Sequence, residues 1–175
     1  MTSGPLVRMR HYSLRDWSGR VVTSSLASEV VVVQARAAIL RRLGASIGSR
    51  VVIEPGTRVV VPSKLSIGHD TYVNSQCVLD ATGGITLGCD VSFGYGVVLT
   101  TQQHDIGPSD HRCGAVRLQP IVIGDGTWIG SSTTVLPGVT IGSGVVVGAG
   151  SLVTRDLEPN GLYLGAPARL VRPLD

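Results

Sequence analysis

The sequence is poor in aromatic rings and in charged side chains. Aromatic residues make up 4% of the chain and charged residues 15%, whereas 23 of its 175 residues are glycine. A core with few rings must take its volume from Val, Ile and Leu, which favour strands and pack into thin layers. The composition therefore predicts one strand-rich domain, large enough to bury a core without disulfides or metals.

Cysteine pairs are also missing. Cys77, Cys89 and Cys113 form neither an even set nor a CxxC motif, which argues against a disulfide framework and a structural zinc site. We interpret them as reduced packing residues. The amino-terminal stretch mixes charged and polar residues, unlike a signal peptide, and together these features predict a cytoplasmic protein.

No apolar run is long and uninterrupted enough to cross a bilayer, so no integral membrane segment is expected. The most apolar stretch, SSLASEVVVVQARAAILRRLG at residues 24–44, contains Glu29 and Arg36 and has further arginines near its end. Basic residues followed by Gly44 are typical of a helix C-terminus, which predicts an amphipathic helix. The net charge of +3 includes no basic run with interleaved aromatics, which disfavours nucleic acid as a partner.

A period of six dominates the sequence from Ile47 onward. The repeated positions, which we call guide residues, hold aliphatic side chains and one phenylalanine: Ile47, Ile53, Val59, Ile67, Val73, Leu79, Leu87, Phe93, Leu99, Ile123, Ile129, Val135, Ile141, Val147 and Val153. Steps of eight replace steps of six after every third hexad, at Val59 and at Leu79. We therefore take three hexads, about eighteen residues, as one structural unit.

This period excludes a helix, because steps of six rotate the guide residues around the helix axis. Glycine follows many of them and would destabilise a helix by about 1 kcal/mol per residue. A β-sandwich is disfavoured because its strands alternate with a period of two. One short strand and one turn per hexad place every guide residue in a single axial core. The sequence therefore predicts an all-β fold, a three-sided parallel β-helix of five coils.

The repeat breaks between Leu99 and Ile123, with three coils before the break and two after it. The register returns after 24 residues where one hexad takes six, which leaves an excursion of 18 residues. So long and polar a loop is usually functional. His104 closes the hexad that starts at Leu99, where the chain leaves the β-helix, and His111 lies inside the loop. Histidine is a suitable general base near neutral pH, whereas a metal site is disfavoured because no third ligand follows at a useful spacing.

From residue 45 to its end the chain resembles the hexapeptide-repeat acyltransferases, and among them the maltose, galactoside and exopolysaccharide O-acetyltransferases. The matching segments are YVNSQCVLD, TTQQHD, IVIGDGTWIGSSTTVLPGVTIGSGVVVGAGSLVTRDL and LGAPARLVRP. The resemblance implies a left-handed β-helix, although the general rule for crossover connections favours the right hand. It also implies a homotrimer that binds acetyl-CoA between subunits and requires no metal.

The resemblance further implies roles for individual residues. His104 matches the general base that activates an acceptor hydroxyl for direct attack on the thioester, and Asn74 and Trp128 match acceptor contacts. His111 is a further acceptor contact to be tested. The cofactor candidates offer a backbone N–H, small faces for pantetheine, or groups suited to phosphate: Ser131, Gly148, Ala149, Thr154, Arg155, Arg169 and Arg172.

We expect an N-terminal segment at 1–44, a β-helix at 45–157 with an extruded active-site loop at 105–122, and a C-terminal cap at 158–175. In the N-terminal segment Asp16 is the nearest candidate for an acceptor-binding acid. The expected activity is O-acetylation of a sugar or sugar-bearing metabolite. Two alternatives stay open: N-acetylation of an amino sugar or antibiotic, and a β-helix that serves only as a structural subunit. A metal-dependent carbonic anhydrase is disfavoured because too few histidines lie within the coils.

Overall fold

The computed structural model describes residues 33–175. Asp16 and the first part of the predicted helix lie outside the described residues. One α-helix, α2 (Val33–Arg42), packs against the first coil through β1 and β2. It is followed by a turn that ends at Gly44, whose φ of 95° favours glycine. No helix of the described chain is both long and apolar enough to cross a membrane.

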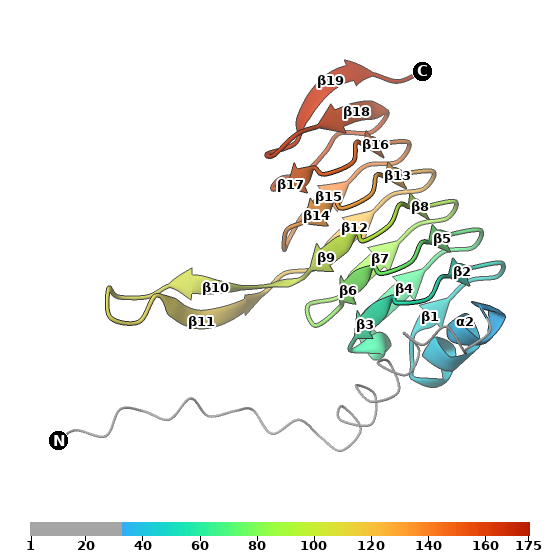
Figure 1. The fold of residues 1–175 in the computed structure, drawn as a ribbon, viewed down its shortest axis with the longest axis horizontal. Helices are drawn as coiled ribbons and strands as arrows, with labels where there is room; N and C mark the ends of the chain where they lie inside the picture. The colour runs from blue at the N-terminus through green and yellow to red at the C-terminus, as the bar shows by residue number, and fades with distance from the viewer. Residues whose placement is uncertain (1–32) are drawn as a thin grey trace.

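Three parallel sheets form the sides of a prism (Figure 1). The first sheet contains β1 (Ser46–Ile47), β4 (Leu65–Ile67), β7 (Ile85–Leu87), β12 (Ile121–Ile123) and β15 (Thr140–Ile141). The second contains β2 (Val52–Ile53), β5 (Tyr72–Val73), β8 (Ser92–Phe93), β13 (Trp128–Ile129) and β16 (Val146–Val147). The third contains β3 (Arg58–Val60), β6 (Val78–Asp80), β9 (Val98–Thr100), β14 (Thr134–Val135) and β17 (Leu152–Val153). Each coil contributes one strand to each sheet, which confirms the predicted parallel β-helix of five coils.

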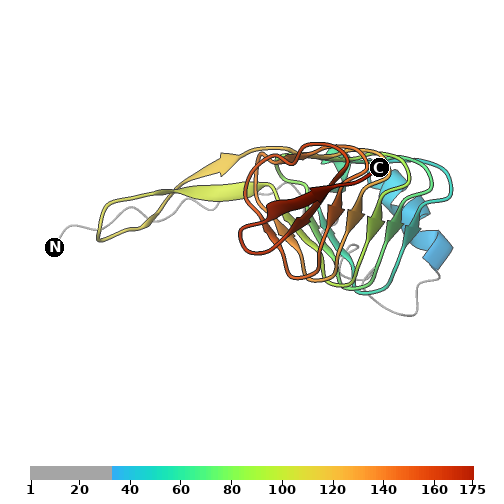
Figure 2. The ribbon, with the colours of Figure 1, turned by 90° about the horizontal axis from the view of Figure 1, so that it is seen from above.

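The guide residues form the core, in three columns that run along the prism. In the second sheet, for example, Ile53 pairs with Val73 and Val73 pairs with Phe93. All guide residues from Ile53 to Val153 are buried, whereas Ile47 is half-buried. Figure 2 shows the coils superimposed around this shared interior. Burial of one aliphatic side chain per hexad is therefore what selects the repeat.

The coils differ in length at the corner between the third and first sheets, which we call the third corner. Ile47, Ile67 and Leu87 occupy the same column and are 20 residues apart, whereas Ile123 and Ile141 are 18 apart. The two additional residues lie in the 3₁₀ turn Pro62–Lys64 and in the turn at 81–84. The predicted unit of eighteen is therefore correct for the fourth coil and wrong for the first two.

The break in the repeat is an antiparallel hairpin rather than an irregular loop. Strands β10 (Gln102–Ile106) and β11 (Cys113–Leu118) pair with each other and project from the third corner, well clear of the prism (Figures 1 and 2). The first strand of the hairpin begins at Gln102, three residues before the start expected for the loop. His104 consequently lies within a strand, and the pairing of that strand limits where its side chain can point.

The C-terminal residues close one end of the β-helix. Strand β18 (Gly161–Leu164) extends the second sheet in parallel with β16, and β19 (Arg169–Pro173) folds back antiparallel to β18. Tyr163 continues the second column of the core above Val147 and is 6% exposed. The two strands thus cover the last coil and leave the arginines of β19 exposed.

Candidate active site

His104 lies on β10 opposite Val116, and its side chain is exposed. The imidazole Nδ1 lies 2.8 Å from the carbonyl oxygen of Gly114 on β11. A carbonyl oxygen only accepts hydrogen bonds, so Nδ1 carries the proton in the neutral ring. This leaves Nε2 with its lone pair directed away from the contact, and such a nitrogen can accept a proton from a hydroxyl.

His111 lies in the turn between the two hairpin strands. Its backbone N–H donates to the carbonyl oxygen of Pro108 at 3.0 Å, and its side chain is exposed. His104 lies within β10, so the two histidines occupy different parts of the hairpin. Along the chain, Asp105 and Ile106 of β10 and the first part of the turn separate His111 from His104.

Trp128 belongs to the second sheet. Asn74 lies at the corner that follows this sheet, which we call the second corner. Asn74 Oδ1 accepts the N–H of Ser75 at 2.8 Å. The left-handed backbone of this turn belongs to Gln76, with φ of 62°, so backbone conformation does not account for an asparagine at position 74. Trp128 stands on the outer face of β13 and is 57% exposed, in one row with Tyr72 of β5. Two exposed aromatic side chains therefore lie on the outer face of the second sheet, with Ser92 between them.

Ser131, Gly148 and Ala149 stack at the second corner, where glycines allow close approach of the coils. A Cβ on Gly130 would lie 2.5 Å from the backbone nitrogen of Ala149, a contact that no side chain tolerates. Ser131 Oγ accepts the N–H of Tyr95 at 3.1 Å. The N–H groups of Ser131 and Ala149 themselves donate no hydrogen bond within residues 33–175. Two adjacent coils thus present unused backbone donors at one edge.

The remaining cofactor candidates lie elsewhere. Thr154 and Arg155 follow β17 at the third corner, and Arg169 and Arg172 lie on β19. The guanidinium groups of Arg169 and Arg172 each donate to one neighbouring carbonyl oxygen, at 3.0 and 3.2 Å. None of the three arginines forms an ion pair within the described part of the chain. Their charges are therefore available to an anionic ligand.

Comparison with known proteins gives consistent matches. Residues 120–155 match the family model described as bacterial transferase hexapeptide (six repeats). The chain is 32% identical to galactoside O-acetyltransferase of Escherichia coli over 143 residues, 82% of this chain and 70% of that protein. It is 38% identical over 145 residues to Escherichia coli WcaF, provisionally named a colanic acid biosynthesis acetyltransferase, covering 83% and 78% of the two chains. A hexapeptide-repeat acetyltransferase of Vibrio cholerae, solved with acetyl coenzyme A, superposes with a TM-score of 0.83 at 29% identity over 93% of this chain and 91% of that one.

The chain belongs to the hexapeptide-repeat acetyltransferases. The resemblance inferred from its motifs is confirmed by these relatives, and so is the fold class.

A single chain of this acetyltransferase does not bring the predicted site residues together. His104 projects from the third corner, whereas Asn74, Trp128 and Ser131 lie on the second sheet or at the second corner. The whole width of the third sheet separates the two groups. The catalytic base and the acceptor contacts expected from the sequence thus occupy different edges of the prism.

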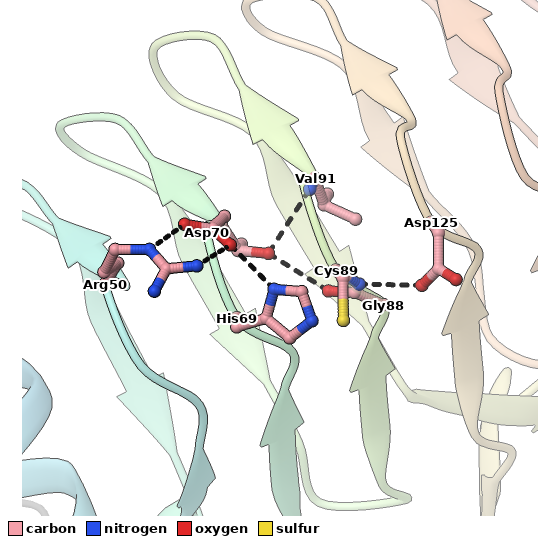
Figure 3. Close-up of polar contacts among 8 residues, drawn as sticks. Arg50, His69, Asp70, Gly88, Cys89, Val91 and Asp125 are labelled. Carbon is pink, nitrogen blue, oxygen red and sulfur yellow. Dashed lines mark hydrogen bonds and ion pairs between the residues drawn. The ribbon is translucent and has the colours of Figure 1, made fainter.

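A cluster at the first corner, between the first and second sheets, was not expected from the sequence (Figure 3). His69 Nδ1 lies 2.7 Å from Asp70 Oδ2, and Asp90 of the next coil completes a group with metal-ligand atoms. Arg50 donates two hydrogen bonds to the Asp70 carboxylate and, with His69, lowers the pKa of Asp70 to about 2. The same pairing raises the pKa of Arg50. We therefore assign the cluster to linking the first two coils, since Arg50 already neutralises Asp70.

The sequence contains a spacing that could have revealed this cluster. Arg50, Asp70 and Asp90 are 20 residues apart, the spacing of successive coils, and all three adopt a left-handed backbone. Gly126 and Gly144 occupy the equivalent place in later coils. A second missed feature is a concave surface on the third sheet beside the root of the hairpin, lined by Arg58, Val60, Val78, Asp80, Val98, Leu99, Thr100 and Gln102.

Proposed function

We propose that this chain transfers the acetyl group of acetyl-CoA to a hydroxyl of a sugar or sugar-bearing acceptor. The observation that carries the proposal is the contact between His104 Nδ1 and the Gly114 carbonyl oxygen, because it leaves Nε2 as an accessible base. The names of the relatives support the chemistry: one is a galactoside O-acetyltransferase, and another was solved with acetyl coenzyme A.

In the proposed reaction His104 Nε2 accepts the proton of the acceptor hydroxyl. The hydroxyl oxygen attacks the thioester carbonyl, and the new C–O bond forms as the carbonyl oxygen becomes an oxyanion. The tetrahedral intermediate then breaks its C–S bond, and the departing CoA thiolate takes the proton from the imidazolium. No acyl-enzyme is needed. Cys113 has no positioned base among its described contacts, which argues against it as a nucleophile.

The unused N–H groups of Ser131 and Ala149 suit the cofactor side of this reaction. The Ser131 N–H would stabilise the thioester oxygen, and removal of one such donor typically costs about 10²- to 10³-fold in kcat. The small faces of Gly148 and Ala149 would let pantetheine approach the backbone. Thr154, Arg155, Arg169 and Arg172 would bind the phosphates, with charge-assisted hydrogen bonds from the guanidinium groups.

The proposed assembly is a homotrimer in which the hairpin of one protomer reaches the second sheet of its neighbour. Two observations support it. His104 and the acceptor contacts lie on different edges of one chain, and the hairpin face that carries His104 also exposes two aliphatic side chains. Val116 and Leu118, opposite His104 and Gln102, are 54% and 40% exposed. The opposite face carries the ion pair between Arg117 and Asp105. A partner would bury Val116 and Leu118 and leave the charged face in water.

We further place the reaction in the cytoplasm. The three cysteines, Cys77, Cys89 and Cys113, are all free thiols, which suits a reducing compartment. Acetyl-CoA is expected to be the co-substrate, with no metal required.

The purified chain should be incubated with acetyl-CoA carrying a labelled acetyl group and with neutral and amino sugars, both as monomers and as oligosaccharides. Label should enter a neutral saccharide and be released by mild alkali, because an ester hydrolyses where an amide does not. Alkali-stable label confined to amino sugars would favour the N-acetyltransferase alternative. An absence of both transfer and CoA binding would favour the structural subunit.

A further inference from the structure

The turn at 81–84, one of the two long corners of the β-helix, packs against the root of the hairpin. The Gly83 N–H donates to Thr101 Oγ1 at 2.7 Å. A Cβ on Gly83 would lie 2.9 Å from the Thr101 carbonyl oxygen and 3.0 Å from the Gln119 nitrogen. Thr101 precedes β10 and Gln119 follows β11, so Gly83 touches the chain on its way out of the β-helix and on its way back. The additional residues of this corner thus build a support for the hairpin.

Asp80, at the end of β6, connects this turn to the first hairpin strand. Its Oδ1 accepts the N–H and the hydroxyl of Thr82, at 3.1 and 2.5 Å. Its Oδ2 accepts Gln102 Nε2 at 2.8 Å. Its backbone oxygen accepts the hydroxyl of Thr101 at 2.7 Å. Asp80 is only 8% exposed and Thr101 is fully buried, so the bond between them is shielded from water, whereas Gln102 lies at the surface.

The network reaches the second hairpin strand as well. The carbonyl oxygen of Thr101 accepts the Gln119 N–H at 2.9 Å. Gln103 Nε2 donates to Gln119 Oε1 at 2.8 Å. Both ends of the hairpin are therefore held to each other and, through Thr101, to Asp80. These contacts lie at the root of the hairpin, where β10 leaves the β-helix.

Gln102 and His104 are two residues apart on β10, so their side chains share one face of the strand. The hydrogen bond from Gln102 to Asp80 therefore fixes the orientation of the face from which His104 projects. A rotation of β10 about its root would displace His104 Nε2 from the acceptor. Misplacement of a reacting group by about 1 Å can cost on the order of 10²-fold in rate.

We propose that Asp80 and the turn at 81–84 form a clamp that sets the angle of the hairpin, and that Asp80 is thereby a positioning residue for His104. This inference rests on the proposed function for its effect on catalysis. Its structural part, an ordered hairpin held by Asp80, stands independently of that function.

The test compares Asp80→Ala with Asp80→Asn. The alanine variant loses every side-chain acceptor and should lower kcat about 10- to 100-fold, with KM for acetyl-CoA within twofold of the original value. Hydrogen–deuterium exchange of the β10 and β11 amides should accelerate. The asparagine variant should keep most of the activity and slow exchange, because Asn Oδ1 still accepts from Thr82 and the Gln102 amide can rotate to accept from Asn Nδ2.

Asp125→Ala is the matched control, because Asp125 Oδ1 also accepts a backbone N–H at a corner, that of Cys89, away from the hairpin. It should change neither kcat nor hairpin exchange. If Asp80→Ala does not fold, Gly83→Ala should give the same pattern through the contacts with Thr101 and Gln119. Unchanged hairpin exchange in both clamp variants would overturn the proposal. So would an asparagine variant as slow as the alanine variant, because that result would assign the effect to the charge of Asp80.

The two proposals can fail separately. A wild-type chain with no transferase activity would defeat the proposed function, whereas the exchange measurement would still decide whether the clamp exists. Faster exchange with unchanged kcat would overturn the positioning role and leave the acetyltransferase assignment intact.

Discussion

His104 Nδ1 lies 2.8 Å from the carbonyl oxygen of Gly114 on the opposite strand of the hairpin. The relationship sets the proton on Nδ1 and keeps Nε2 free, which is the tautomer that a general base requires. It depends on the pairing of β10 with β11, since only that pairing brings the Gly114 carbonyl beside the ring. In the proposed reaction the hairpin therefore sets the tautomer of the base, and in the proposed assembly it also extends toward a neighbouring protomer.

The proposed site between subunits predicts complementation between two slow variants. His104→Ala removes the base from the hairpin, and Trp128→Ala removes the acceptor surface from the second sheet, so each homotrimer should turn over slowly. In mixed trimers from co-expression at equal levels, about a quarter of the sites should pair an intact hairpin with an intact second sheet. Acetyl transfer per site should recover to about that fraction of the wild-type rate.

The control for complementation is a mixture of the two separately purified trimers, kept under conditions where subunits do not exchange. That mixture should stay slow. Co-expressed trimers with no more activity than this control would place all site residues within one protomer and contradict the proposed assembly.

CoA should stabilise the chain against thermal unfolding. A ligand that binds only the folded state contributes about 2.7 kcal/mol at a hundredfold excess over its Kd.

The double variant Arg169→Gln with Arg172→Gln should weaken CoA binding at least tenfold, because a hydrogen bond to a charged group contributes about 1.5–3 kcal/mol. Pantetheine has no phosphates, so its binding should be the same in the variant and the wild type. Calorimetric titration of both ligands measures this, with Arg112→Gln as the control. Equal loss of pantetheine binding would show that the arginines support the fold instead.

The ion pair of Arg50 with Asp70 should contribute stability that depends on pH. The pKa of Asp70 is lowered to about 2 in the folded chain, chiefly by the hydrogen bond from Arg50. A carboxyl with a depressed pKa stabilises the folded state above its unfolded pKa, about 3.9, and loses that contribution as the pH falls through its folded pKa. Asp70→Asn should therefore lower the free energy of unfolding at pH 7, and the difference from wild type should shrink between pH 4 and pH 2.

Urea titrations at several pH values measure this difference. Arg50→Met should give the same loss at pH 7, and the double variant should lose little more than either single variant, because both changes remove one interaction. A difference between Asp70→Asn and wild type that persists unchanged at pH 2 would exclude the ion pair as its cause.

The sequence predicted the β-helix because one physical requirement recurs at every guide residue. Each hexad must bury one side chain, as Val73 and Phe93 do, and the spacing alone reveals this requirement. The hairpin was predicted only as a loop, since the exposed residues from Gln102 to Leu118 have no buried face to impose a period. Its strands are defined by pairing with each other, which a count along the chain does not reveal.

The site residues, too, were predicted where a pattern along the chain revealed them and missed where their role depends on a distant residue. His104 was predicted because it stands where the chain leaves the β-helix and matches the general base that the resemblance implies, and its role remains a prediction. Asp80 was missed because VLD reads as the end of an ordinary hexad, whereas its role depends on Gln102, 22 residues later. The step of eight after Leu79 was the available signal, because the additional residues form the turn against which the hairpin rests.

The most direct test of the account is the turnover of His104→Ala with an accepted saccharide, measured as acetyl transfer at saturating acetyl-CoA. Loss of a positioned general base should lower kcat by about 10²- to 10⁴-fold. Oligomeric state and CoA affinity should be unchanged, because the side chain is exposed and outside the core. His111→Ala, the control on the same hairpin, should mainly raise KM for the acceptor. A His104→Ala chain that keeps near wild-type kcat would contradict the account.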